Sequence, residues 1–422
     1  MTEALASDVR TGAITTTTAC RSCGSSDRRV VLSFGDTPLS DVLLTAEQLQ
    51  VPEARYPLEL MVCEDCALVQ LRDSVDPVVL YGGHYPYYSS VSPGLVAHFE
   101  ACAEQLRIAR GLGPDSLVVE AASNDGVLLR PFADAGIPVL GIDPAHGPAA
   151  AAEAAGVPTM VDYFGLPVAE RLAAAGRRAD LLLGANVLNL VDDPNDFAAA
   201  TARLLTDDGV AVLEVPYVAD TVDQGAFDNV FHQNVTYWSA TSAADLFARH
   251  GLALVDAERI ETFGGSLRLS IARHGVVSPR LDALLGDERA RGVDTFDYFA
   301  GFAARTAATR EALVDLLRSA RANGARIAAY GAAGGMATTL LSYAGIDSAL
   351  IDYAVDRNPH KHGWFTAGSH LEIHPPDRLV DDPPDLLLLC AWNYEREVLA
   401  QQHAFRAAGG RVVVPIPHPR IV

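Results

Sequence analysis

Four of the six cysteines in this 422-residue sequence form two C-x2-C pairs. Cys20 and Cys23 make the first pair, Cys63 and Cys66 make the second, and 39 residues lie between the two pairs. Two such pairs bring four thiolates around one Zn²⁺ in the tetrahedral arrangement that this ion prefers. Because a closed four-cysteine site leaves no position for water, we expect the zinc ion to be structural. Two disulfides or a redox pair are the alternatives, which a cytoplasmic setting and the lack of a thioredoxin-like context disfavour.

A second set of polar residues follows a buried apolar run. Glu120 ends that run, and Ser123, Asn124, Asp125 and Gly126 form a small-residue turn before an expected helix start. Such a turn lets a ligand approach the backbone and meet the N–H groups of the helix N-terminus. The turn is not G-x-G-x-x-G, which makes a dinucleotide a weak interpretation. It suits a cofactor with an amino-acid tail, whose ammonium would face Glu120 or Asp125.

Three further polar residues stand at the ends of apolar runs. Asp143 follows the second run, where a carboxylate accepts hydrogen bonds from both hydroxyls of a ribose. Asn186 and Glu214 stand at the ends of the third and fourth runs, where open α/β sheets bind ligands. Together with the turn, Asp143 predicts S-adenosylmethionine as the cofactor.

These residues need an α/β scaffold to position them. Near-continuous apolar runs alternate with Ala-rich helical stretches, which indicates right-handed βαβ units and a parallel sheet covered on both faces. The expected strands are 117–120, 139–142, 179–183 and 210–214, followed by an antiparallel pair at 252–258 and 266–273. The expected helices are 95–110, ended by Gly111, then 148–155 opening on a proline, 168–175 and 196–205.

The rest of the chain adds two parts to this central sheet. Short strand-like runs at 30–34, 56–62 and 67–71 form the zinc-binding module. A helical region at 277–323 leads to a second strand, Gly-rich loop, helix and strand series. We therefore predict an α/β protein with a small zinc-binding module at 15–75, a cofactor-binding Rossmann-like domain at 76–275 and a second Rossmann-like domain at 276–422.

Composition excludes several kinds of partner. Lys plus Arg total 32 and Asp plus Glu total 53, so the net charge is −21. No basic block could follow a phosphate backbone, which argues against nucleic acid and anionic membranes. No apolar run approaches the roughly 20 residues that span a bilayer, and residues 1–18 lack the apolar core of a signal peptide. We expect a cytoplasmic protein that acts on a small molecule.

Ten sequence blocks, in the same order, resemble the three-domain S-adenosylmethionine-dependent sugar C-methyltransferases. The similarity runs from about residue 18 to the C-terminus. The blocks are Cys20–Cys23, Pro38–Asp41, Tyr56–Leu58, Cys63–Leu71, Tyr85–Ser90, Glu120–Leu129, Asn186–Val187, Glu214–Tyr217, Gly264–Arg268 and Asp356–Lys361.

The resemblance implies a zinc-binding N-terminal domain, a central domain with a class I methyltransferase fold, and a Rossmann-like C-terminal domain that helps to hold substrate. It also implies reaction at a carbon beside the ketone of a nucleotide-linked deoxysugar, with S-adenosylhomocysteine as the product. The resemblance implies that this reaction belongs to natural-product biosynthesis, including the biosynthesis of antibiotics.

The sequence departs from this family where catalysis is expected. The family's Tyr-His-Glu-His signature, whose second histidine is thought to remove a proton, is here Phe231-His-Gln-Asn234. The family's Asn-Val-x-x-His is Asn186-Val-Leu-Asn-Leu190. The Gly-Ala-x-x-Lys-Gly loop is Gly331-Ala-Ala-Gly-Gly-Met-Ala337, without the lysine that could meet a diphosphate. This loss, in so acidic a chain, argues against a sugar nucleotide unless arginines such as Arg268 or Arg357 compensate.

Four residues are candidates for catalysis. His232 is the histidine left within the signature, either as a general base or as a structural group. Asn234 stands in the position of the family's base, although an amide has no useful basicity. Tyr85 and Tyr88 could close over the methyl donor and supply a phenol.

Two other functions remain open at this level. The protein could close a cyclopropane ring from an adduct of substrate and S-adenosylmethionine made by a radical S-adenosylmethionine enzyme, which would then be a partner. Alternatively, loss of several catalytic positions could mark a catalytically silent scaffold homologue, which would not bind the cofactor.

Overall fold

The computed structural model describes residues 14–81 and 87–422. Its first sheet is antiparallel and contains β2 (Arg28–Thr37), β4 (Tyr56–Cys63) and β5 (Val69–Leu71) of the zinc-binding module. The fourth strand of this sheet, β12 (Thr236–Tyr237), comes from the middle of the chain and pairs with β5. The three expected strand regions of the module are therefore confirmed. The sheet of the module is completed by β12, which follows β5 by more than 160 residues in the chain.

The central sheet has seven strands in the order β13-β14-β11-β10-β7-β8-β9. Five are parallel, and β14 and β13 are antiparallel at one edge. This order is that of the class I methyltransferase fold, as expected from the sequence. The strands are β7 (Val118–Ala121), β8 (Val139–Ile142), β9 (Thr159–Met160), β10 (Ala179–Ala185), β11 (Leu205–Pro216), β13 (Ala253–Ile260) and β14 (Ser266–Ala272).

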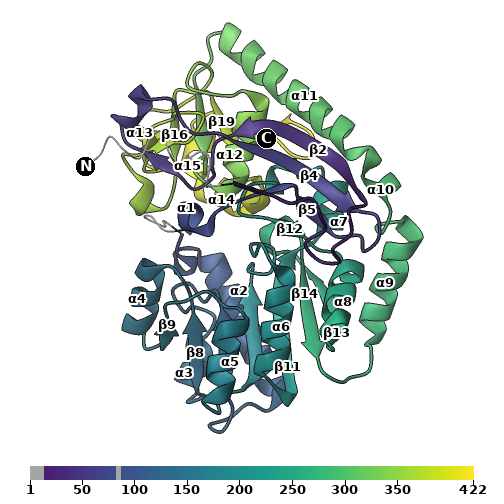
Figure 1. Ribbon diagram of the computed structural model, residues 1–422. Helices are drawn as coiled ribbons and strands as arrows, with labels where there is room; N and C mark the ends of the chain where they lie inside the picture. Colours follow the sequence, from purple (N-terminus) through teal and green to yellow (C-terminus); the bar gives the residue numbers. More distant parts are fainter. Residues whose placement is uncertain (1–13, 82–86) are drawn as a thin grey trace.

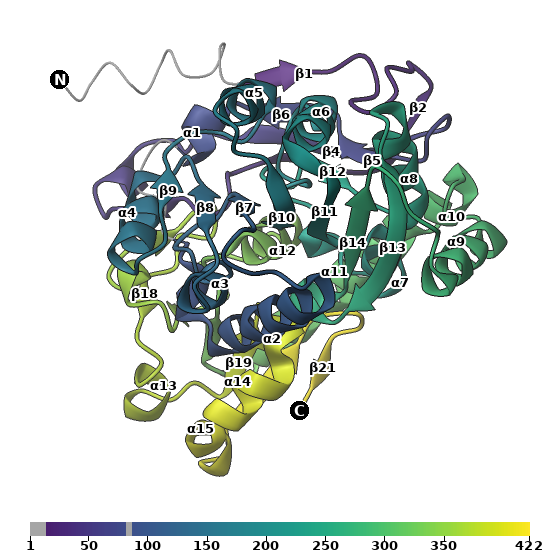
Figure 2. The ribbon, with the colours of Figure 1, turned by 90° about the horizontal axis from the view of Figure 1, so that it is seen from below.

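Helices cover both faces of the central sheet (Figures 1 and 2). Side chains of α2 (Pro93–Arg110), α3 (Arg130–Asp134) and α4 (His146–Ala154) pack on one face. Those of α5 (Leu166–Ala174), α6 (Pro194–Leu204) and α8 (Ala240–Arg249) pack on the other. Alternate residues of each strand point to opposite faces, which explains the nearly continuous apolar runs in the sequence.

The first or last residues of three predicted helices can be compared with the structure. The helix at 95–110 is confirmed as α2, which Ser92 caps and Gly111 ends at φ 60°. The helix expected to open on Pro148 begins at His146 instead. The expected helix directly after the turn at 122–126 is wrong, because α3 begins only at Arg130 and has five residues.

The C-terminal sheet has six strands in the order β18-β16-β15-β19-β20-β21, with only β21 antiparallel. Helices α11 (Phe302–Ala322) and α12 (Gly335–Ala344) pack on one face of it, and α13 (Arg378–Asp381), α14 (Glu395–Gln401) and α15 (His403–Ala407) on the other. The strands are β15 (Ile327–Tyr330), β16 (Tyr353–Val355), β18 (Ile373–His374), β19 (Leu386–Leu389), β20 (Arg411–Val414) and β21 (Arg420–Ile421).

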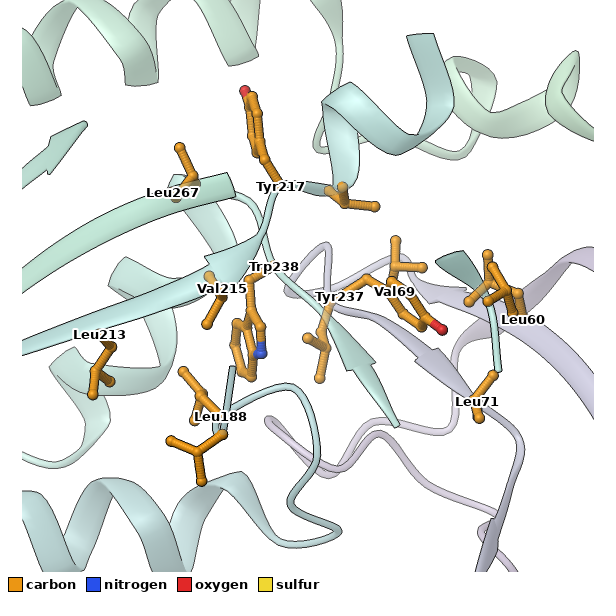
Figure 3. Packing of buried hydrophobic residues seen from close by; sticks show 14 of the residues in the cluster. Leu60, Val69, Leu71, Leu188, Leu213, Val215, Tyr217, Tyr237, Trp238 and Leu267 are labelled. Atoms are coloured by element: carbon orange, nitrogen blue, oxygen red, sulfur yellow. The ribbon is translucent and has the colours of Figure 1, made fainter. Parts of the chain in front are cut away.

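One continuous apolar core joins the three sheets. Leu60, Val69 and Leu71 of the zinc-binding module pack beside Tyr237 and Trp238, which in turn contact the ends of central-sheet strands (Figure 3). The same core continues into the face of the C-terminal sheet that α11 and α12 cover. In the described part of the chain, no helix is long and apolar enough to cross a membrane.

Specific contacts lock the C-terminal sheet to the rest. β17 (Phe365–Thr366) pairs with β3 (Leu43–Leu44) of the zinc-binding module. The Thr339 hydroxyl on α12 donates to the carbonyl of Val230 at 2.7 Å. Trp392 Nε1 donates to the carboxylate of Asp228 at 2.7 Å.

Asp228 is fully buried, and its Oδ1 has no hydrogen-bond partner. Burial raises the pKa of Asp228 to about 7, although the Trp392 hydrogen bond opposes the rise. An unfolded aspartate has a pKa of about 3.9, so the folded chain binds more protons between about pH 4 and pH 7. The contribution of Asp228 to stability is therefore lost as the pH rises through that window.

We predict that Asp228→Asn reduces this pH dependence, because the amide keeps an acceptor for Trp392 and cannot ionise. The Tm should fall less between pH 5 and pH 8 in the variant than in the wild type. Asp36→Asn, at an exposed position on β2, is the matched control and should show the wild-type fall. An unchanged pH dependence in Asp228→Asn would contradict the assignment.

Candidate active site

The four cysteines of the two C-x2-C pairs meet in one cluster. Their sulfur atoms all lie within 4.8 Å of one another, with Cys20 Sγ 3.6 Å from Cys66 Sγ and Cys23 Sγ 3.6 Å from Cys63 Sγ. A tetrahedral site with Zn–S bonds of about 2.3 Å places sulfurs about 3.8 Å apart, so the cluster has the dimensions of a zinc site. All four are free thiols, which rules out the disulfide interpretation for this structure. The donor set fits structural zinc.

The local backbone explains how each pair turns toward the metal. Gly24 and Ala67, which directly follow the second cysteine of each pair, have φ values of 78° and 58°. This left-handed conformation closes a tight turn and points both sulfurs to one side. The Gln70 side-chain amide donates to Cys20 Sγ at 3.1 Å, which favours a thiolate there.

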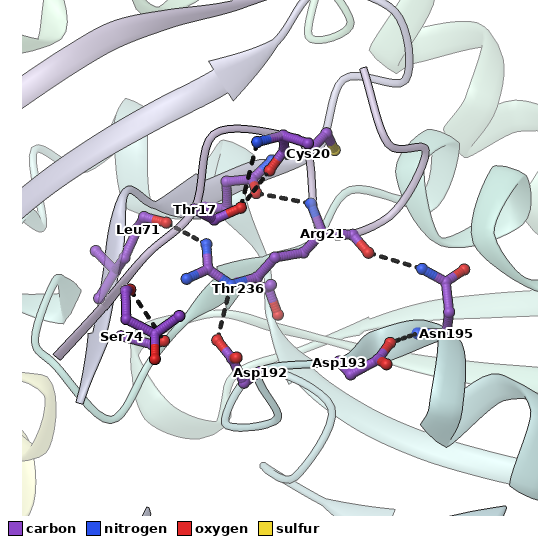
Figure 4. Close-up of polar contacts among 12 residues, drawn as sticks. Thr17, Cys20, Arg21, Leu71, Ser74, Asp192, Asp193, Asn195 and Thr236 are labelled. Atoms are coloured by element: carbon purple, nitrogen blue, oxygen red, sulfur yellow. Dashed lines mark hydrogen bonds and ion pairs between the residues drawn. The ribbon is translucent and has the colours of Figure 1, made fainter. Parts of the chain in front are cut away.

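Arg21, between the first two cysteines, ties the zinc site to the central domain (Figure 4). Its side chain is 4% exposed, and its Nε lies 3.0 Å from Oδ1 of Asp192. The Arg21 guanidinium also donates to the carbonyl of Leu71. The backbone carbonyl of Arg21 accepts a hydrogen bond from Asn195 Nδ2 at 2.7 Å. Since Asp192 lines the cavity described next, the zinc site holds one wall of that cavity.

A cavity of about 670 Å³ lies between the two Rossmann-like domains, within the size range of ligand pockets. Residues after β7, β8 and β10 line one side, and residues of 330–337, 356–361 and 390–398 line the other. Asp41 of the zinc-binding module and the segment 229–234 lie between them. One cavity therefore has room for both a methyl donor and an acceptor.

Unusual backbone conformations mark this cavity. Among the described residues, six that are not glycine have positive φ, and four of them line the cavity: Asp41 (56°), Ala122 (54°), Asn124 (49°) and Asn186 (53°). Such conformations cost free energy and persist where the surroundings enforce them, typically at ligand sites.

Asp143 lies at the tip of β8, as expected, and lines the cavity. Its two carboxylate oxygens accept hydrogen bonds from the backbone N–H groups of Asn124 and Ala145, each at 2.8 Å. Burial raises the pKa of Asp143, while these two hydrogen bonds oppose the rise. Each oxygen keeps a lone pair for a ribose hydroxyl, so the residue fits the predicted role.

Two of the predicted cofactor residues instead hold the loop that follows residue 86. Asn124 Oδ1 accepts the N–H of Ser89 at 2.9 Å, and Asp125 Oδ2 accepts the N–H of Ser90 at 3.1 Å. Asn124 still lines the cavity, whereas Asp125 does not. Their side chains therefore act through the loop, and direct cofactor binding by Asp125 stays a prediction.

Of the other predicted cofactor residues, one lines the cavity and the rest do not. Asn186 lines the cavity, and its N–H donates to the carbonyl of Glu214 at 2.8 Å. Glu120, Ser123, Gly126 and Glu214 lie behind the cavity wall. Burial and the carboxylates of Asp143 and Asp125 raise the pKa of Glu120. A Cβ at Gly126 would lie 3.0 Å from that of Val157, so Gly126 serves the packing of the turn.

Glu214 differs most from expectation. His98 Nε2 lies 2.9 Å from its Oε2, and Arg268 Nε lies 2.8 Å from its Oε1. Burial favours the neutral acid, but His98 and Arg268 hold the pKa of Glu214 below its usual range. Because both oxygens are engaged, neither Glu214 for the cofactor nor Arg268 for a phosphate is free to act in the cavity.

His232 does not line the cavity. Its imidazole is buried, lies 3.3 Å from the carbonyl of Tyr56 and packs edge-on against the Tyr56 ring. Burial lowers the pKa of His232 to about 4. The structure thus gives the general-base interpretation no geometric support, because the ring faces the zinc-binding module.

Asn234 lines the cavity within a network of amides. Its Oδ1 accepts from Asn189 Nδ2 at 2.8 Å, and its Nδ2 donates to the carbonyl of Asn229 at 3.1 Å. The neighbouring Gln233 Oε1 accepts from the Ser40 hydroxyl at 2.7 Å. The ring of Phe231, which lacks a phenol, fits against the Gly-rich loop, where a Cβ at Gly335 would lie 2.9 Å away.

Of the two predicted tyrosines, Tyr85 lies outside the described residues. Tyr88 lines the cavity, and its ring stacks on His360 of the C-terminal domain with ring centroids 5.6 Å apart. Tyr88 therefore bridges the two domains at the cavity, and its catalytic role stays a prediction.

Two residues of the cavity had no role assigned from the sequence. Lys361 is the single lysine of the chain, and its Nζ donates to the carbonyl of Ala333 in the Gly-rich loop at 3.0 Å. The loop itself lacks the family's lysine, as the sequence shows, but a lysine reaches it from another segment. Asp41 is the second residue. Both stand in blocks that carried the family resemblance, which was the available signal.

Comparisons with known proteins agree along the chain. A family model described as "Putative zinc binding domain" matches residues 20–81, a methyltransferase domain matches 98–257, and a C-methyltransferase C-terminal domain matches 261–417. The C-methyltransferase NovU of Streptomyces niveus is 34% identical over 410 residues, which cover 96% of this chain and 96% of that protein.

Two other similarities each cover less than half of the chain. A ubiquinone biosynthesis O-methyltransferase of Azorhizobium caulinodans is 32% identical over 123 residues, 28% of this chain and 46% of that protein. The structure of magnesium protoporphyrin IX methyltransferase from Synechocystis PCC 6803 with bound SAM has a TM-score of 0.33 and 18% identity. It covers 43% of this chain and 80% of that one.

We predict that Cys63→Ser lowers the zinc content well below about one ion per chain and lowers the Tm, because a hydroxyl replaces one of four thiolates. Elemental analysis of the purified protein measures the metal. Cys102→Ser, at a buried cysteine of α2 outside the cluster, is the matched control and should keep its zinc. Equal zinc content in the two variants would refute the four-thiolate site.

We predict that Asp143→Ala weakens S-adenosylhomocysteine binding by about 1 to 3 kcal/mol, or about 5- to 150-fold, because hydrogen bonds to a charged acceptor are lost. Calorimetry measures the affinity, and the Tm verifies folding. Asp115→Ala, at an exposed position, should bind as the wild type does. Equal affinities in both variants would overturn the placement of the cofactor.

Proposed function

This chain belongs to the C-methyltransferase family and is an S-adenosylmethionine-dependent methyltransferase, and from that premise we propose which acceptor it methylates. The acceptor is a carbon atom beside the ketone of a nucleotide-linked deoxysugar, in natural-product biosynthesis. The observation that supports this proposal is the shared cavity, where Lys361 and Arg357 of the C-terminal domain lie opposite the ends of β7, β8 and β10.

The donor half of the cavity fits S-adenosylmethionine. Asp143 would bind the ribose, and the turn after β7 would lie against the amino-acid tail. Tyr163 and Phe164, which follow β9 and line the cavity, provide apolar walls for an adenine ring. The cofactor supplies an electrophilic methyl group on its sulfonium. The residues of the chain hold the donor and exclude water, and alignment of two bound reactants contributes on the order of 7 to 11 kcal/mol to the rate.

The acceptor half fits a nucleotide sugar better than the sequence indicated. Lys361 and Arg357 lie on the turn after β16, and both line the cavity. Arg357 lies 2.7 Å from Glu397, and Lys361 lies 3.7 Å from Asp356, so each cation is partly neutralised. Under this proposal Arg357 is the cation that meets the diphosphate, despite the net charge of −21.

The proposal also assigns a role to each of three domains. Residues 15–75 would form the zinc-binding domain, 76–275 the cofactor domain and 276–422 the substrate domain. The ring-closing alternative, with its radical partner enzyme, has no support among the relatives, and it becomes an outcome of the experiment. The silent-scaffold alternative predicts no binding of S-adenosylhomocysteine.

We predict that the purified zinc-loaded protein methylates at least one member of a panel of dTDP-4-keto-6-deoxysugars. Mass spectrometry should show the added methyl group, and NMR should locate it on carbon beside the ketone. Asp143→Ala and a reaction without S-adenosylmethionine are the controls. A panel without methylated product, from a protein that binds S-adenosylhomocysteine, would contradict the sugar acceptor and leave ring closure to be tested.

A further inference from the structure

The cavity needs a proton acceptor, because none of the expected bases serves it. A carbon beside a ketone becomes a nucleophile when a base removes its proton. The His232 ring faces away from the cavity, and Asn234 is an amide. This inference rests on the proposed acceptor class and asks which residue of the chain takes the proton.

Seven carboxylates among the described residues line the cavity, and six of them are already engaged. The engaged ones are Asp143, Asp192, Asp193, Asp196, Asp356 and Glu397, each of which accepts a hydrogen bond from a backbone N–H or an arginine. The seventh is Asp41, for which the described residues show no such hydrogen bond; its carboxylate lies near the neutral amide of Gln233 and the positive charge of Lys361.

Asp41 stands beside the position that the family's base occupies. Its carboxylate interacts with the side-chain amide of Gln233, and Gln233 precedes Asn234. The turn that carries Asp41 is held firmly on both sides. The Ser40 hydroxyl donates to Gln233 Oε1 at 2.7 Å, and a Cβ at Gly368 would lie 2.6 Å from Pro38. The φ of 56° at Asp41 belongs to this constrained turn.

The surroundings suit proton transfer. Burial raises the pKa of Asp41, Lys361 partly offsets the rise, and Asp356 adds to it. Burial and, less strongly, the charge of Asp41 raise the pKa of Tyr87. A modest increase in pKa suffices for an aspartate base when a donor stabilises the oxygen anion that forms. Lys361 is such a donor, since it lines the same cavity and its side chain is only 12% exposed.

We propose that Asp41 is the general base of the methyl transfer and that Lys361 stabilises the enolate oxygen of the acceptor. The Asp41 carboxylate takes the proton from the carbon beside the ketone. The electron pair of that C–H bond forms the C=C bond of the enolate, and the carbonyl oxygen takes the negative charge opposite Lys361. The carbon then forms its bond to the donated methyl group, S-adenosylhomocysteine leaves, and Asp41 returns the proton to solvent.

Exchange of the acceptor proton in D₂O separates this step from methyl transfer. With S-adenosylhomocysteine in place of the methyl donor, the wild type should exchange the proton beside the ketone of a dTDP-4-keto-6-deoxysugar. Asp41→Asn should slow exchange and methylation by about 100-fold or more. Asp41→Glu, which keeps a carboxylate, should retain higher rates of exchange and methylation than Asp41→Asn. The control Asp36→Asn should have the wild-type rates. All variants should bind S-adenosylhomocysteine equally.

Lys361→Met gives a second signature. Without the ammonium, the pKa of Asp41 rises further, so the acidic limb of the exchange rate should move to higher pH. A merely structural role of either residue would not move this limb. Exchange by Asp41→Asn at the wild-type rate, while the wild type methylates the sugar, would overturn the inference and leave the proposed function intact.

A measurement that needs no acceptor uses the single lysine. An amine-reactive acetylating reagent labels Lys361, and peptide mapping separates it from the N-terminal amine. At a fixed, near-neutral pH, Lys361 should be labelled faster in Asp41→Asn than in the wild type and at the wild-type rate in Asp36→Asn, because only the former removes a negative charge that favours the unreactive ammonium. No change in Asp41→Asn would overturn the inference even if no sugar of the panel is methylated.

Discussion

The pairing of β5 with β12, and the apolar core around it, is the interaction on which the rest of the structure depends. It places the zinc-binding module against the central domain, while β3 and β17 join the same module to the C-terminal domain. Tyr237 and Trp238 continue this core into the central sheet. The small module therefore sets the relative position of two Rossmann-like domains, and with it the width of the cavity between them. Zinc matters to function through this route, since a closed four-thiolate site performs no chemistry itself.

The cavity contains backbone conformations and close negative charges that lower the stability of the folded chain. Four of its residues adopt a left-handed backbone without being glycine, and several carboxylates stand within one acidic space. Most of these carboxylates are held by backbone N–H groups or arginines, which stabilise the charge without using it for catalysis. The exception, Asp41, lies where the module, the 229–234 segment and the C-terminal domain meet. Strain and partly compensated charge at that junction are the usual structural costs of a working site.

Loss of the family's second histidine therefore does not remove basicity from the site. In this chain the position holds Asn234, which belongs to an amide network with Asn189 and Asn229. In the proposed mechanism the proton acceptor is instead Asp41, a carboxylate from another segment that lines the same cavity. Likewise, the lysine that is missing from the Gly-rich loop is supplied from the turn after β16. In both cases the same chemistry is available from another segment of the chain.

The sequence by itself determined the zinc ligands, the alternating strands and helices of the α/β sheets and the position of Asp143 at the tip of a strand, because each depends on local spacing or on apolar periodicity. It assigned roles to His232 and Glu214 for which the structure gives no geometric support, because the direction of each side chain depends on partners far away in the chain, Tyr56 for one and His98 and Arg268 for the other. It also could not bring Asp41 and Lys361 together, since 319 residues lie between them in the chain. Only the tertiary structure decided which carboxylates remain available, because that depends on which backbone groups and cations reach them after the three sheets have packed.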